Sequence, residues 1–173
     1  RYLALAGFDA HPGDSDAARE EFFASMARCE TRRDVEEAYR TGIEKLESIE
    51  RNKPADALRI GIVGEYFTAA DPRSNLDIER KLLAMGVEVS CSMNVTNRNI
   101  RYNEPELRRE IEEYVAYDMG PTSTLTIASA KRYADEGFDG IVHLKSSGCT
   151  PEIDCMPVLQ RISRERKIPV LFL

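Results

Sequence analysis

The chain has 173 residues, the size of one domain or of one domain with a helical extension, and enough to bury a single sizeable core. Its 24 Lys and Arg against 30 Asp and Glu give a net charge of −6, so no general attraction to nucleic acid is expected. No apolar run approaches the roughly 20 residues that span a bilayer, and no signal-peptide pattern opens the chain. We therefore expect a cytoplasmic protein that binds neither nucleic acid nor a membrane.

The cysteines are not spaced like a disulfide framework. They stand at positions 29, 91, 149 and 155, too few and too irregular for such a pattern, so each is expected to be a free thiol or a metal ligand. The ends of the chain carry a separate expectation. It begins at Arg1 and stops inside the apolar run 168–173, which is typical of a buried strand, so we expect a fragment of a longer protein that could hold only part of an active site.

Residues 1–56 are predicted to form a helical segment. Apolar side chains recur at helical spacing among many charges, and the pair Thr31 and Asp34 fits a capping box that starts a second helix after a break near Glu30. The resulting stripe has to be covered, either by the rest of the chain or by a second copy of it. Its members are Phe22, Met26, Cys29, Val35, Tyr39, Ile43 and Leu46.

Residues 57–173 are predicted to form an α/β domain. Four short apolar runs alternate with helical patterns and show no polar face, which favours a parallel sheet covered on both sides. We expect an open, doubly wound, flavodoxin-like sheet of at least four strands in the order second, first, third, fourth. The strands are expected at 58–63, 87–91, 140–144 and 168–173, and the helices at 74–85, 104–118, 122–136 and 155–166.

Several familiar catalytic signatures are absent from the sequence. The turn from Gly61 to Gly64 has neither the third glycine of a dinucleotide fingerprint nor the Gly-Lys-Ser/Thr ending of a phosphate loop, and no nucleophile elbow of the form Gly-x-Ser-x-Gly occurs. The two histidines, His11 and His143, are not at metal-ligand spacing. We expect His143, in an apolar strand, to be a packed core residue more readily than a catalytic base.

The polar loop 145–154 contains the strongest candidate for chemistry. It follows a predicted strand and leads into a helix, so Cys149 is expected at the sheet edge near free N–H groups, which favour a thiolate suited to metal ligation or redox chemistry. Cys155 is a second candidate ligand, or a packed small apolar group. The spacing is not Cys-x-x-Cys, so a loop cysteine without function stays an equal alternative for Cys149. Cys29 and Cys91 are expected to fill core space.

The loop 64–76 is the second candidate. It is long for a connection between a strand and a helix, and it lies at the edge where ligands bind in such sheets. Glu65, Tyr66 and Asp71 are therefore predicted to face the substrate, on the side from which Cys149 is accessible. The alternative is a surface loop in which Asp71, Pro72 and Ser74 form a turn and a helix cap.

These motifs together resemble a known family. Gly64-Glu65-Tyr66, Asp71-Pro72 and Asn75-Leu76 in one loop, then the stretch 137–152 around Gly148-Cys149-Thr150-Pro151-Glu152, and finally Lys167-Ile168-Pro169 are similar to the C-terminal α/β domain of the 2-hydroxyacyl-CoA dehydratase and benzoyl-CoA reductase family. The resemblance covers roughly residues 58–173. The same architecture occurs in CoA-substrate-specific enzyme activases, so it indicates the superfamily more surely than the member.

The resemblance implies an iron–sulfur lyase of anaerobic metabolism. In that family an ATP-dependent activator passes an electron to a [4Fe-4S] cluster, and an acyl-CoA substrate loses its hydroxyl group through a ketyl radical. Cys149 matches one of three cluster cysteines, but residues 1–57 offer only Cys29 as a partner. The cluster is thus expected in the intact parent and not in this piece alone. The alternatives are a noncatalytic domain of an activase-related protein without a cluster of its own, and a flavodoxin-like module without a redox group.

Overall fold

The structure, a computed structural model, describes residues 6–93, 104–117 and 119–173. By its internal contacts the chain divides into two compact units. One consists of the residues up to 57 together with 82–88, and the other of residues 58–81 and 89–173. We call the first the helical unit and the second the α/β unit. In the described ranges, no helix has both the length and the apolar composition that a bilayer crossing demands.

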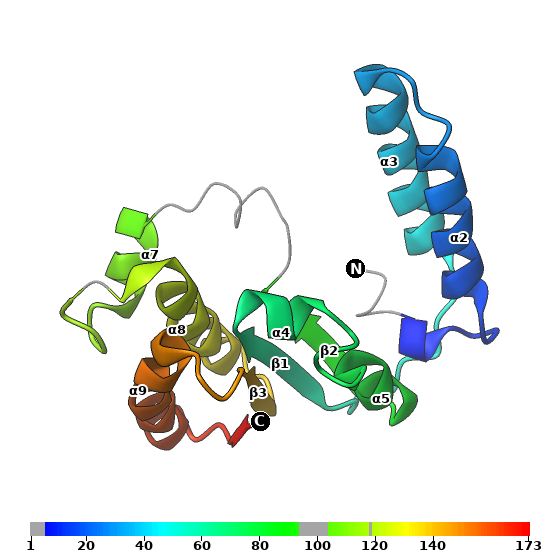
Figure 1. Cartoon of the computed structure of the whole chain (residues 1–173). Helices are drawn as coiled ribbons and strands as arrows, with labels where there is room; N and C mark the ends of the chain where they lie inside the picture. The colour runs from blue at the N-terminus through cyan, green and yellow to red at the C-terminus, as the bar shows by residue number, and fades with distance from the viewer. Residues whose placement is uncertain (1–5, 94–103, 118) are drawn as a thin grey trace. The chain divides into compact units, whose positions relative to one another are not determined.

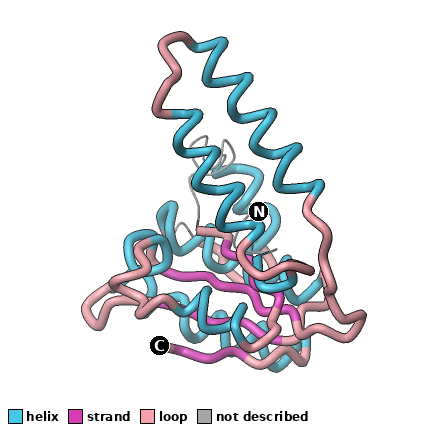
Figure 2. The backbone as a smooth tube through the Cα atoms, turned by 90° about the vertical axis from the view of Figure 1, so that its right-hand side faces the viewer, coloured by secondary structure: helices cyan, strands magenta, loops and turns pink. Residues whose placement is uncertain are grey.

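The helical unit contains a hairpin of two helices. A short 3-10 turn, η1 (Ala6–Phe8), precedes α2 (Asp14–Met26) and α3 (Arg32–Ser48), and Figure 2 shows the two long helices side by side. The break between them confirms the predicted pair. Thr31 caps α3 as expected, because its hydroxyl accepts from the Asp34 N–H at 3.2 Å while the Asp34 carboxylate accepts from the Thr31 N–H at 2.9 Å.

The apolar stripe of this hairpin is covered only in part. The Phe22 ring meets the Tyr39 ring edge-on, with centroids 6.5 Å apart, and lies so near Gly42 that a Cβ there would overlap it. Ile43 is half-buried, but Val35 and Tyr39 are 39% and 59% exposed. The expectation that the whole stripe is covered is therefore met for some of its members and not for others.

The α/β unit is organised around a four-stranded sheet with the order β2-β1-β3-β4. The strands are β1 (Arg59–Gly64), β2 (Glu88–Cys91), β3 (Gly140–Leu144) and β4 (Val170–Phe172). All are parallel, with Ile60 paired to Gly140 and Ile141 to Val170. These findings confirm the open, doubly wound, flavodoxin-like class and the predicted order of the strands.

Five helices accompany the sheet in the described residues: α4 (Tyr66–Ala70), α5 (Ile78–Ala84), α7 (Glu104–Ile111), α8 (Gly120–Asp135) and α9 (Thr150–Arg166). The chain steps from β1 to β2 in one direction and from β2 to β3 to β4 in the other. Right-handed connections therefore put α4 on one face and α8 and α9 on the opposite face. Helices α8 and α9 pack against each other there, as Figure 1 shows, and α7 packs on α8.

The centre of the unit is a mostly apolar core between β1, β3, α8 and α9. Gly61 lets α8 approach β1 closely, because a Cβ at this position would overlap the ring of Tyr133. The Tyr133 hydroxyl then donates to the Ser90 carbonyl at 3.0 Å, so its polar end is satisfied although its ring is buried. Fully buried side chains at the centre include Ile62, Val63, Ile127, Leu159 and Ile162.

The region after β1 differs from the predicted loop and helix. Helix α4 was not predicted; it forms because Glu65 caps it, accepting from the Phe67 and Thr68 N–H groups at 2.8 Å each. The helix predicted over 74–85 begins only at Ile78, because Leu76 and Asp77 both have φ of 56°, a left-handed conformation that a helix cannot include. The long connection is thus one short helix, a turn and a second helix.

The region after β3 also differs from the prediction. We expected a loop over 145–154 and a helix from 155, but α9 begins at Thr150 with Cys149 as its N-cap. Pro151 lies in the first turn of α9, where its missing N–H costs nothing. In addition, the helix predicted over 104–118 ends at Ile111, whose carbonyl accepts from both the Tyr114 and the Val115 N–H groups in a turn.

Candidate functional site

The loops after β1 and β3 start side by side at the C-terminal edge of the sheet. Gly64 and Leu144, the last residues of the two strands, are paired in register, and the Glu65 N–H donates to the Leu144 carbonyl at 2.9 Å. Ligands of doubly wound folds bind beyond this edge. The two loops predicted to carry function therefore leave the sheet from adjacent positions.

Cys149 lies in the second of these loops, where the chain enters α9. Its N–H donates to the Ser146 carbonyl at 3.2 Å, and its own carbonyl accepts from the Ile153 N–H at 3.0 Å, so the backbone is fixed on both sides. The side chain makes no capping hydrogen bond, and the residue is half-exposed. Its thiol is therefore held at the N-terminus of α9, at the C-terminal edge of the sheet.

Cys155 does not join Cys149 at this edge. It lies within α9 and is fully buried, with its Sγ donating to the Pro151 carbonyl at 3.2 Å and 3.7 Å from the carbonyl oxygen of Ser123. Burial, together with the nearby charge of Glu152, raises the pKa of the Cys155 thiol. A protonated thiol that packs between two helices acts as a small apolar residue, which is the structural alternative stated for it above.

The acidic residues of the first loop serve local structure. Partial burial raises the pKa of Glu65, but hydrogen bonds from the Thr68 side chain and from backbone N–H groups outweigh it and leave that pKa below its usual range. Asp71 accepts from the Ser74 hydroxyl at 2.8 Å, which with the Arg73 N–H lowers the pKa of Asp71. Tyr66 is half-buried, and burial raises its pKa. Glu65 is thus the N-cap of α4, and Asp71 holds the turn that follows this helix. The turn is the one that the alternative for this loop proposed, but the next helix begins only at Ile78 and is not capped by Ser74.

A buried polar network beneath this edge was missed by the sequence analysis. His143 on β3 and Glu152 in the first turn of α9 are both fully buried, with His143 Nε2 2.8 Å from Glu152 Oε2. The Thr126 hydroxyl of α8 lies 3.3 Å from the other carboxylate oxygen and 3.4 Å from the Gly64 carbonyl oxygen. His143 was predicted to be a packed strand residue, and it is one, but its polar partner was not foreseen.

The positions of the thiols show whether the described residues could hold an iron–sulfur cluster. In the described parts of the chain, no three His, Cys, Asp or Glu side chains converge in a way that could hold a metal ion. Cys91 at the end of β2 is no better placed than Cys155, because burial and the charge of Glu79 raise its pKa to about 12. Cys149 is thus a single donor, and the described residues do not by themselves hold a cluster.

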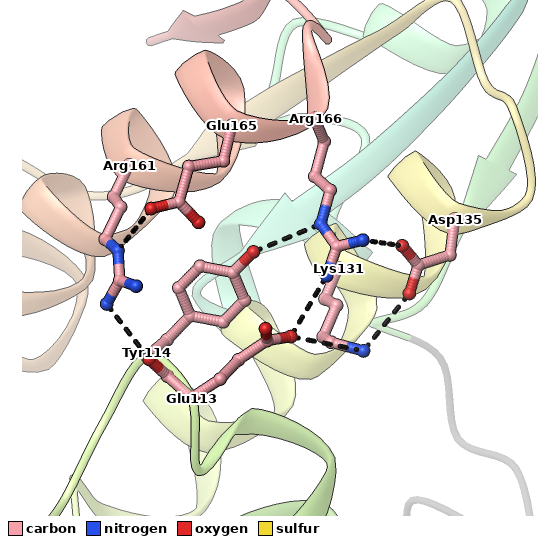
Figure 3. A network of polar contacts seen from close by, with 7 residues as sticks. All are labelled: Glu113, Tyr114, Lys131, Asp135, Arg161, Glu165 and Arg166. Atoms are coloured by element: carbon pink, nitrogen blue, oxygen red, sulfur yellow. Dashed lines mark hydrogen bonds and ion pairs between the residues drawn. The ribbon is translucent and has the colours of Figure 1, made fainter.

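A second polar cluster, which we call the α7 clasp, fixes the turn after α7 against α8 and α9 (Figure 3). It comprises Glu113, Tyr114, Lys131, Asp135, Arg161, Glu165 and Arg166. Arg166 donates to the Tyr114 hydroxyl at 3.2 Å and to Glu113 at 3.0 Å, and the Arg161 guanidinium lies 4.9 Å from the centre of the Tyr114 ring. Because its charges neutralise one another, the clasp is a structural contact and not a site for a charged ligand.

The helical unit has a shallow concavity of about 530 Å³ at the loop end of its hairpin. Cys29 lies in it beside charges of both signs, including Arg33 and Asp34. The Cys29 thiol donates to the Ser25 carbonyl at 3.4 Å, and Asp34 is committed to the cap of α3. Among the described residues, this lining offers no set of three side chains that could hold a metal ion.

Comparison with known proteins finds no relative of the chain: no family model, no curated protein and no solved structure matches it.

Proposed function

We propose that the α/β unit supplies Cys149 as one thiolate ligand of a [4Fe-4S] cluster in a protein of the 2-hydroxyacyl-CoA dehydratase type. The observation that supports it is the position of this thiol, half-exposed at the N-terminus of α9 and beside the loop that follows β1. When bound, such a cluster supplies the one-electron chemistry with which an acyl-CoA loses its hydroxyl group. The electron would come from an ATP-dependent activator protein.

In the proposed site, this chain holds and orients one sulfur donor, the thiolate of Cys149. The remaining ligands would come from outside the described residues, since Cys155 is buried, Cys91 is half-buried, and burial raises the pKa of both thiols. The first loop would contribute shape through Glu65 and Asp71, whose carboxylates are already bound by backbone and hydroxyl donors. We place this chemistry in the cytoplasm, away from nucleic acid and membrane, and leave homo-oligomerisation as a further expectation.

The proposal is tested by anaerobic reconstitution of the full-length protein with iron and sulfide. Cys149→Ser is expected to remove most of the bound iron and the broad visible absorbance of the cluster, whereas Cys155→Ser keeps both, because its thiol is outside the donor set. A Cys149→Ser protein with the iron content of the unsubstituted protein would overturn the proposal.

A second candidate function is a noncatalytic domain of an activase-related protein that carries no cluster of its own. The observation in its favour is that the Glu65 and Asp71 carboxylates are occupied in a helix cap and a turn, and that Cys149 is a single donor among the described residues. For this candidate, the folded full-length protein should take up no iron, and Cys149→Ser should leave its binding to a separate cluster-bearing protein unchanged. Iron bound through Cys149 would exclude it.

A further inference from the structure

The buried pair of His143 and Glu152 lies directly along the chain from Cys149, and its geometry points to a role for Glu152. We propose that Glu152 is a positioning residue for Cys149: it fixes the first turn of α9 to the sheet and thereby sets where the thiol is held. The inference rests on the proposed function in that it concerns the same thiol, but the placement it describes does not depend on any bound metal.

Glu152 is at the usual position for a helix-capping glutamate but does not cap α9. It is the third residue of α9, after the N-cap Cys149, and a glutamate there commonly turns back to the N–H of the N-cap residue. In this chain the Cys149 N–H is already bonded to the Ser146 carbonyl at 3.2 Å. The Glu152 side chain instead points inward, to His143 on β3 at 2.8 Å. The carboxylate therefore joins the helix start to the strand and not to its own cap.

Helix α8 holds the same turn by two further contacts. The Thr126 hydroxyl lies 3.3 Å from the second oxygen of Glu152 and 3.4 Å from the Gly64 carbonyl oxygen at the end of β1. The Ser123 hydroxyl donates to the Pro151 carbonyl at 3.0 Å, one residue before Glu152. The first turn of α9 is thus tied to β3 and α8, and through Thr126 to the edge of β1.

The energetics favour a single arrangement of this turn. A carboxylate at zero exposure is costly unless it is paired, and a buried pair gains little stability over apolar side chains of the same size. What the network does provide is a specific geometry for the carboxylate, since its two oxygens meet His143 and Thr126 from two different elements, although His143 Nδ1 has no partner among the described residues. Because the Cys149 side chain makes no capping bond of its own, its location depends on the turn that Glu152 holds.

The test measures how fast Cys149 reacts with iodoacetamide in the native, full-length, metal-free protein. Peptide mass spectrometry gives the fraction of Cys149 labelled at each time. Glu152→Ala should release the first turn and raise the rate at Cys149 at least about threefold, as expected for local opening. Glu152→Gln keeps an oxygen for His143 and should stay close to the unsubstituted rate. Leu159→Ala is the matched control, because Leu159 is fully buried on the same helix but away from its first turn.

All rates are compared at the same interval below each variant's midpoint of thermal unfolding. An equal acceleration in Glu152→Ala and Leu159→Ala, or none in either, would overturn the inference, because Glu152 would then act only through overall stability. If Glu152→Ala does not fold, Thr126→Val serves instead and should give a smaller acceleration; an unchanged rate would count against the role of the network. This experiment involves no iron, so a negative result does not affect the proposed role of Cys149 as a cluster ligand. In the same way, a negative result in the iron experiment does not affect the positioning role of Glu152.

Discussion

Gly64 and Leu144 lie so close at the ends of β1 and β3 that a Cβ on Gly64 would overlap the Leu144 carbonyl oxygen. The same glycine has φ of 133°, which side chains rarely adopt. Both constraints arise where the two loops predicted to carry function begin, because the Leu144 carbonyl also accepts the Glu65 N–H. The junction of the loops is therefore fixed by backbone contacts.

Gly64→Ala is expected to lower the free energy of unfolding by more than about 3 kcal/mol, since backbone and not a flexible side chain would have to move. Gly137→Ala is the matched control, because Gly137 also has positive φ, at 71°, but a Cβ there meets nothing within 4 Å. It should cost only about 1 kcal/mol. Urea unfolding measures both, and equal costs would show that strain alone, without the contact to Leu144, decides the effect.

Thr31→Ala should remove the cap of α3 and lower the free energy of unfolding by about 1 kcal/mol. Ser48→Ala, at the other end of the helix, should cost much less, since the Ser48 hydroxyl only donates to the Lys45 carbonyl. Circular dichroism during urea unfolding compares the two. A cost for Ser48→Ala as large as that for Thr31→Ala would contradict a specific capping role.

The cap of α3 should also depend on pH. Hydrogen bonds from the Thr31 side chain and the Thr31 N–H lower the pKa of Asp34 from its ordinary value of 3.8. A group with a lowered folded pKa stabilises the fold fully above its unfolded pKa and loses that contribution as pH falls through the folded one. Stability should thus decline below pH 3.8 in part through Asp34, and Asp34→Asn should flatten this part of the profile. An unchanged acid profile in Asp34→Asn would refute the assignment.

Arg166→Met should lower the free energy of unfolding at low salt by weakening the α7 clasp, because Arg166 contacts Tyr114, Glu113 and Asp135 together. The difference should shrink in about 1 M salt, which screens exposed charges. Arg32→Met is the control, since its single ion pair with Glu36 is highly exposed and should contribute little. A salt-independent loss in Arg166→Met would mean that packing, and not charge, holds the turn after α7.

Native alkylation at pH 8 should label Cys149 well before Cys91 and Cys155. With a pKa of about 12 for Cys91, only about one thiol in ten thousand is a thiolate at this pH, and Cys155 is fully buried with a raised pKa as well. Peptide mass spectrometry after timed quenching gives the order. Labelling of Cys155 at the rate of Cys149 would show that the α8–α9 contact opens readily, against its dense packing.

The strands were predictable because each is a short apolar run bounded by turn residues, and their order followed from right-handed connections. The start of α3 was predictable because Thr31 and Asp34 form a local motif. By contrast, α4 depends on how Glu65 turns back onto its own chain, and the late start of α5 depends on the left-handed Leu76 and Asp77. No local sequence pattern predicts these backbone conformations.

The candidate site was predictable only in its outline. Placing Cys149 at the sheet edge required only that β3 precede it. The pair of His143 and Glu152 could not be foreseen, because it forms between a strand and a helix nine residues apart in the chain, and the predicted helix began too late to include Glu152. A glutamate three residues after a loop cysteine and next to Pro151 was the one available signal, since proline favours the first turn of a helix.

The central strands β1 and β3 are neighbours in space but far apart in the chain, as the bond from the Arg59 N–H to the Asp139 carboxylate shows across 80 residues. Closing so long a loop costs entropy before any strand pairing compensates for it, and such distant contacts form slowly. The α2–α3 hairpin, made of near neighbours, can assemble first. During that delay the core that buries the Cys155 thiol is incomplete, so in the newly made chain this thiol is open to oxidants before the sheet has closed.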